Sequence, residues 1–228
     1  MIATAPLVDT LAAIDFADAT YDDVALALQN AEYAEGDAAG FTTETFREDE
    51  ISGHLVVSSP TTVGAYDAAS GAVSEQEVDQ TDVVPFRIDF ADDLLEVFGG
   101  RADARRVRDH LGRLDDASLT FEDFEIDVPG LYDALAAGDL DTTVTSVRVR
   151  NFSPIEQTEG DCFLRVGEDA DVDALLDEYG SDVYFLGTEL AVDGDTVTVG
   201  VYETGAVQVY SSTDATESLL ASLKTAVR

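Results

Sequence analysis

The sequence predicts an α+β protein made of two related units, each an antiparallel sheet covered by a helix. From residue 51 onward, apolar residues recur at alternate positions, which is the period of a half-buried strand. Turn signals such as Asp193-Gly194 separate these runs. An apolar stripe with helical spacing follows the last strand of each unit, as expected for a helix that returns across its sheet.

The first 50 residues predict a helical segment followed by a loop. Residues 2–32 carry apolar side chains at mixed helical spacings, and Thr20 stands ahead of two acids as a helix cap. Residues 33–50 contain two glycines and several acids, so we expect a loop there. The apolar positions behind the helical prediction are Leu7, Leu11, Ile14, Val24, Leu26 and Leu28.

Residues 51–118 form the first predicted sheet unit. Its helix covers residues 101–114, because Ala104, Val107 and Leu111 share one stripe. Ser-Pro, Ser-Gly and Asp-Asp pairs mark the turns between its strands. The four predicted strands are residues 55–57, 62–66, 83–90 and 94–98.

A connecting segment, residues 119–143, leads to the second predicted unit, residues 144–228. The connection has weak strand character over 119–128 and a short helix over 130–137 that follows Pro129. Asp171 and Gly180 are typical caps for a helix over 172–179, and Thr213 is expected to cap the final helix. The predicted strands of the second unit are residues 144–152, 162–166, 183–192, 196–202 and 206–210.

An internal repeat relates the two units. When residue n is set beside residue n+112, Phe90 falls against Tyr202 and Val97 against Val209. Leu111 likewise falls against Leu223, so both copies read strand, tight turn, strand and helix. Duplication and the chance recurrence of a common hairpin-and-helix pattern both explain the match.

Charge dominates the composition. The 228 residues include 48 acidic and only 12 basic side chains, a formal charge of −36, while 45% of the residues are apolar. Such a surface repels itself at ordinary salt, where the Debye length is about 8 Å, and much less at 1 M salt, where it is about 3 Å. The composition resembles that of haloarchaeal cytoplasmic proteins; the alternative is an acidic protein that binds partners or mimics nucleic acid.

Other classes of protein are disfavoured. No window has the roughly 18 uninterrupted apolar residues of a membrane span, and no basic stretch precedes an apolar one at the amino terminus. The single cysteine, Cys162, cannot form an internal disulfide or a cysteine-based metal cluster. We therefore expect a cytoplasmic protein.

The stretch "TVTVGVYETGAVQVYSS", residues 196–212, with its flanking helices resembles one half of the saddle of the TATA-binding protein family and related helix-grip domains. The resemblance covers residues 144–228 and, less clearly, 51–114, and it rests on topology. It implies the fold alone. The family's DNA-binding face is flanked by basic residues, whereas residues 144–228 have few besides Arg148, Arg150 and Arg165.

No motif predicts catalysis. His54 and His110 are the only histidines, and neither lies in a Gly-x-Ser-x-Gly context. Residues 169–180 begin like a calcium loop, but Ala174 and Gly180 occupy the positions that require Gly and Glu. We expect no catalytic residues, no metal site and no cofactor. An acid-base hydrolase with cleft carboxylates stays an alternative.

Arginines give the clearest pattern for binding. Five of the 12 bases fall within helix 101–114. One interpretation is a docking surface for phosphates or for an acidic partner. The other is that these arginines pair with neighbouring acids such as Asp103 and Asp109. Two more lie on the strand 144–152, for which the same two interpretations hold. The candidate binding residues are Arg101, Arg105, Arg106, Arg108, Arg113, Arg148 and Arg150.

These observations predict a non-enzymatic binding or adaptor protein of an extreme halophile, archaeal or viral. Nucleic acid, as in transcription, and an acidic protein are the candidate partners, and a homo-oligomer is compatible with the pattern. A structural or virion assembly protein, joined through its edge strands, is the alternative from another class.

Overall fold

The computed structural model describes residues 7–47, 49–67, 71–115, 117–137, 141–153, 160–167, 170–192 and 195–210. Within these ranges the chain has an α+β fold with eleven strands and four α-helices, which confirms the predicted class. The chain divides into two compact units, residues 13–122 and residues 1–12 with 123–228. This division joins the first residues to the C-terminal half, whereas the predicted segments follow chain order.

In the unit of residues 13–122, four strands lie in the order β2, β3, β4, β5, and their ladders are antiparallel. Helix α2, Arg101–Leu111, packs on β4 and β5 through Ala104, Val107 and Leu111, all of which are buried. The strands are β2 Ala39–Arg47, β3 Glu50–Asp67, β4 Ala72–Asp89 and β5 Leu94–Val97.

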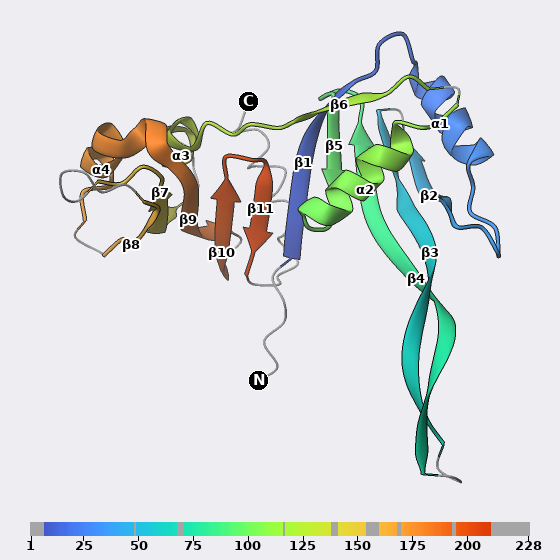
Figure 1. Ribbon diagram of the computed structural model, residues 1–228. Coiled ribbons are helices and arrows are strands. Elements are labelled where there is room, and N and C mark those ends of the chain that lie inside the picture. Colours follow the sequence, from blue (N-terminus) through green and yellow to red (C-terminus); the bar gives the residue numbers. More distant parts are fainter. Residues whose placement is uncertain are drawn as a thin grey trace. The chain divides into compact units, whose positions relative to one another are not determined.

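Strands β3 and β4 extend far beyond their neighbours (Figure 1). They pair from Glu50 and Asp89 out to Asp67 and Ala72, while β2 pairs with β3 only as far as Val57. Strand β5 pairs with β4 only as far as Phe86. Residues 58–67 and 72–81 therefore form a two-stranded ribbon, called the arm below, that no other described strand flanks.

The predictions for the N-terminal segment are partly wrong. Helix α1, Tyr21–Asn30, begins at a capping box in which Thr20 and Asp23 bond each other's backbone N–H, as the sequence indicates. Residues Leu7–Asp15, however, are strand β1, which pairs with a strand near the other end of the chain. The expected loop over residues 33–50 contains β2, whose Phe41 is buried against Phe86.

The two strands expected at residues 55–57 and 62–66 are one strand, β3. The Ser59-Pro60 pair suggested a turn, but Pro60 lies opposite Asp79, past the last residue of β3 that pairs with β2. Proline is tolerated at such an open strand edge, because no neighbour there needs its missing N–H.

In the other unit, the strands lie in the order β1, β11, β10, β9, β7, β8. Helices α3 and α4 pack on one face of this sheet, where Val147, Leu186 and Val199 are fully buried. The predicted meander is confirmed, and so is the helix over 172–179. The elements are α3 Val128–Ala137, β7 Thr142–Val149, β8 Cys162–Arg165, α4 Val172–Tyr179, a 3-10 turn Gly180–Asp182, β9 Val183–Val192, β10 Asp195–Tyr202 and β11 Ala206–Val209; the short β6, Thr120–Asp123, precedes them.

The final helix predicted from Thr213 falls outside the described residues, so the internal duplication stays a prediction. Among the helices that the structure does describe, none combines the length and apolar composition needed to cross a membrane.

Two glycines on β3 provide a test of how tightly this sheet is packed. A Cβ atom at Gly53 would lie 2.3 Å from the backbone oxygen of Thr42, whereas at Gly64 it would meet only Val73 Cγ1 at 3.5 Å. We expect Gly53→Ala to lower the free energy of unfolding by about 1–3 kcal/mol, because backbone must move. Gly64→Ala should change it by less than about 0.5 kcal/mol. Denaturant unfolding in molar KCl measures both, and equal losses would contradict this packing.

Candidate binding surface

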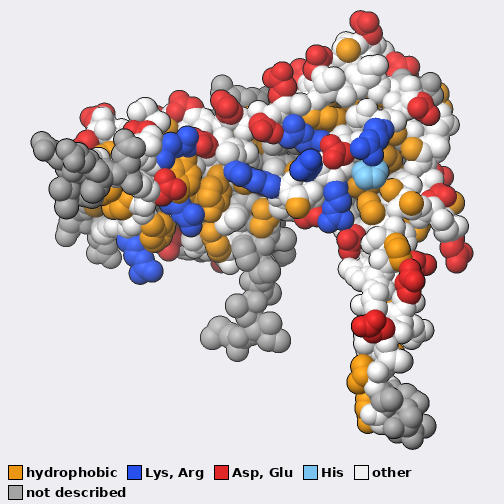
Figure 2. Space-filling model, viewed as in Figure 1, with side chains coloured by type: hydrophobic (Ala, Val, Ile, Leu, Met, Phe, Trp, Pro, Cys, Tyr) orange, Lys and Arg blue, Asp and Glu red, His pale blue; other side chains and the backbone are white. Residues whose placement is uncertain are grey.

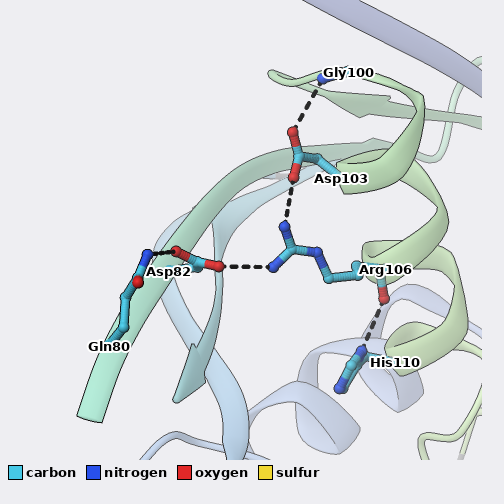
Figure 3. Close-up of polar contacts among 6 residues, drawn as sticks. All are labelled: Gln80, Asp82, Gly100, Asp103, Arg106 and His110. Atoms are coloured by element: carbon cyan, nitrogen blue, oxygen red, sulfur yellow. Dashed lines mark hydrogen bonds and ion pairs between the residues drawn. The ribbon is translucent and has the colours of Figure 1, made fainter. Parts of the chain in front are cut away.

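The arginines of α2 are held largely by acids of their own unit. Arg106 donates from Nη1 to Asp82 at 3.1 Å and from Nη2 to Asp103 at 3.0 Å (Figure 3). Asp103 also accepts a hydrogen bond from the Gly100 backbone N–H at 3.2 Å, so it serves the helix start as well. The Nδ1 atom of His110 lies 2.8 Å from the Arg106 carbonyl oxygen. This network fixes Arg106 between the sheet and its own helix.

Two other arginines of α2 also have partners. Arg105 lies 3.9 Å from Asp109, a loose pair between exposed side chains, and Arg108 donates to the Phe121 carbonyl oxygen at 3.2 Å. Arg101 and Arg113 are both exposed. No described acid lies at ion-pair distance from Arg113. Arg105 and Arg106 therefore pair with acids, which is the second of the two interpretations of the sequence, and Arg108 donates to a backbone carbonyl.

A hollow of about 200 Å³ lies beside Arg106, at the base of the arm. It is open and it is lined by two carboxylates as well as by the guanidinium, so the negative charges outnumber the positive one. It therefore suits an acidic partner poorly. Its lining residues are Asp82, Val83, Val84, Pro85, Phe98, Asp103 and Arg106.

Sequence reasoning missed an ion pair with a buried carboxylate. Glu96 is 1% exposed, and its Oε2 accepts from Arg87 Nε at 2.7 Å and lies 2.5 Å from Arg87 Nη2. Arg87 also lies 3.6 Å from Glu50, and its guanidinium stacks over the Phe98 ring. Arg87 and Glu96 are directly opposite on β4 and β5, so a cross-strand pairing of the predicted strands could have found them.

The unit of residues 1–12 and 123–228 holds an arginine whose neighbours are aromatic rings. The Arg148 guanidinium on β7 lies over the rings of Phe163, Phe185 and Tyr202, at 5.6, 5.1 and 5.8 Å from their centroids. Its Nε atom is buried without a hydrogen-bond partner, and no described carboxylate forms an ion pair with it. Arg148 is thus held by ring faces, which attract a cation through their quadrupoles.

Strand register explains why these rings meet. Arg148 stands opposite Phe163 of β8 and Phe185 of β9, and Phe185 stands opposite Tyr202 of β10. Residues directly opposite in antiparallel strands share a face, so all four side chains lie on the face away from α3 and α4. No described helix packs on this face.

Two glycines make room for the central ring. A Cβ atom at Gly200 would lie 2.7 Å from Phe185 Cε2, and one at Gly187 would lie 3.3 Å from Phe185 Cε1. Phe185 therefore lies flat on the backbone of β9 and β10, and it is buried although it is on the face that no described helix covers. The rings of Phe185 and Tyr202 are 4.6 Å apart.

Basic and apolar side chains continue around this cluster. Phe163 is 52% and Tyr210 48% exposed. The pKa of Tyr210 is raised, mainly by burial, and the nearby Arg148 offsets part of this rise. Arg165, opposite Ser146, is exposed on the same face and has no described acidic partner. Figure 2 shows hydrophobic side chains with Lys and Arg among them over the region of β7 to β11. The Arg148 face is defined here as Arg148, Phe163, Arg165, Phe185, Tyr202 and Tyr210.

Arg150, also a candidate, is paired. Its guanidinium contacts the Glu203 carboxylate and stacks over the Tyr184 ring at 5.3 Å. The hydrogen bond to Glu203 raises the pKa of Arg150. Of the two candidate arginines in the predicted strand 144–152, only Arg148 is therefore without a described carboxylate.

A scan against protein-family models and a search of curated proteins found no match to this chain.

The histidines and acids give no metal site within the described ranges, where no group of three or more His, Cys, Asp or Glu side chains could hold an ion. His54 lies 3.7 Å from Glu44, an exposed carboxylate.

Removing Arg87 should destabilise the protein strongly, because the Glu96 carboxylate would stay buried without its guanidinium. We expect Arg87→Met to lower the free energy of unfolding by roughly 3 kcal/mol. Arg105→Met, which removes an exposed and loose pair, should cost under about 0.5 kcal/mol. Unfolding by urea in molar KCl gives both values, and a mild effect at Arg87 would show that the pair does not hold β4 to β5.

Proposed function

We propose that this chain is a non-enzymatic binding protein of an extreme halophile and that the Arg148 face is its contact surface. One observation carries the proposal: Arg148 is surrounded by aromatic rings and has no described carboxylate, in a chain with four acids for every base.

The arrangement of Arg148 favours a role in contact with a partner. A guanidinium whose Nε is buried without a hydrogen bond has lost hydration that its own fold does not replace. An anionic group of a partner could bind the remaining donors, and the exposed Phe163 and Tyr210 offer apolar area beside it. Arginine and tyrosine are among the side chains that most often dominate binding energy at interfaces.

An acidic protein segment suits this face better than a nucleic acid does. A nucleic-acid backbone requires several phosphates to be neutralised, and the described residues of this face supply two guanidinium groups, those of Arg148 and Arg165. A short acidic segment with apolar side chains needs fewer basic contacts. The aromatic rings could also stack on bases, so single-stranded nucleic acid is the comparison to make.

The proposal includes the halophilic source and the distant structural relationship that the sequence suggests. A haloarchaeal source explains the charge, and a distant relation to the helix-grip domains would explain a sheet with helices on one face. Assembly is the second candidate function, and the observation that favours it is the arm, which protrudes from its unit with exposed apolar side chains.

Replacing the guanidinium by an uncharged side chain of similar length tests the proposal. We expect Arg148→Met to weaken binding at least about tenfold, the loss typical of a central arginine. Binding is measured in molar KCl as self-association, by sedimentation velocity, and as anisotropy of labelled single-stranded RNA and DNA.

Arg47→Met is the matched control, because Arg47 is exposed in the other unit and has no described ion pair. The proposal fails if Arg148→Met behaves like Arg47→Met in both assays while circular dichroism shows both variants folded.

A further inference from the structure

We propose that the partner of the Arg148 face is the arm of a second copy of this chain, so that copies join head to tail. This inference rests on the proposed function, because it names the occupant of that contact surface.

The arm is an incomplete structure by itself. It is a ribbon of ten residue pairs, from Ser58 opposite Thr81 to Asp67 opposite Ala72, with no described strand at either edge. A two-stranded hairpin is at best marginally stable in water, and its unpaired backbone groups are available to another chain. Tyr66 and Val73, which stand opposite each other near its end, are 68% and 72% exposed. Such apolar area on a ribbon needs a partner surface.

One face of the arm combines apolar and acidic side chains. Tyr66 and Val73 share it with Glu75, opposite Gly64, and Glu77, opposite Thr62, because alternate pairs of a ribbon point to the same side. Both glutamates are exposed. The sequence has no Lys or Arg between Arg47 and Arg87, so the arm contains no basic residue.

The Arg148 face presents the complementary pattern. It offers exposed aromatic side chains in Phe163 and Tyr210, and guanidinium groups in Arg148 and Arg165. Phe163 and Arg165 lie on β8, which is the last strand in the order of its unit, so one edge of β8 has no described neighbour. An acidic and apolar ribbon therefore fits this face in charge, in hydrophobicity and in its capacity for strand pairing.

The size of the arm sets the expected strength. Ten residues of strand are roughly 33 Å long and two strands are roughly 10 Å wide, so the contact is small. Interfaces of this size are transient, with dissociation constants on the order of micromolar or weaker. Because the two surfaces differ, the contact is heterologous and produces rings or open chains of copies.

The first experiment removes the apolar part of the arm. We expect Tyr66→Ser with Val73→Ser to weaken self-association at least about tenfold in sedimentation velocity. Both side chains are mostly exposed, so the fold does not depend on them. The matched control is Leu26→Ser on α1, a residue that is 54% exposed and outside the arm. Equal behaviour of arm and control variants overturns the inference.

The second experiment exchanges the charges. At the lowest KCl concentration that keeps the protein folded, Glu75→Arg with Glu77→Arg should weaken self-association about threefold to tenfold, and Arg165→Glu should weaken it less. All three substitutions in one chain should restore part of the loss. Arg47→Glu in place of Arg165→Glu should restore none, and a triple variant no better than this control overturns the inference.

The outcomes separate this inference from the proposed function. A protein that stays monomeric at every concentration, yet binds RNA or DNA in a manner that depends on Arg148, overturns the arm as partner and leaves the proposed function standing. If Arg148→Met changes neither assay, both fail.

Discussion

Repulsion among 48 carboxylates opposed by only 12 bases is the constraint on which this structure depends. With acids in such excess, several arginines have a carboxylate within reach. Arg106 is held by Asp82 and Asp103, and Arg87 by Glu50 and Glu96. These pairs join strands and helix within one unit. An arginine that is surrounded by rings instead of carboxylates is therefore informative, and Arg148 is such a residue.

Local signals in the sequence predicted the elements whose partners are near in the chain. The Asp193-Gly194 turn placed β9 and β10, and the Asp171 cap placed α4. Strand β1 was missed because its ladder partner β11 is some two hundred residues away, with Leu7 opposite Val209, and no local pattern records such a pairing. The apolar and polar residues of Leu7–Asp15 fit the spacing of a helix as well as that of a strand.

The candidate site could be predicted only in part for the same reason. Arg148 was among the candidate residues, but the rings of Phe163, Phe185 and Tyr202 come from three different strands, and only the register brings them together. The arm was missed because Ser59-Pro60 looked like a turn. Its length is a property of the β3 and β4 ladder as a whole.

In concentrated salt, where charges are screened within a few ångströms, contacts made by rings and apolar side chains become more important relative to long-range attraction between charges.

The dependence of folding stability on KCl tests the electrostatic account most directly. Thermal unfolding is followed in dilute buffer, in 3 M KCl and in sorbitol of equal osmolality. Screening predicts that KCl raises the melting temperature far more than sorbitol does, because only the salt relieves repulsion among the carboxylates. Cooperative unfolding in dilute buffer at the same temperature as in KCl, or an equal gain from sorbitol, would contradict the account.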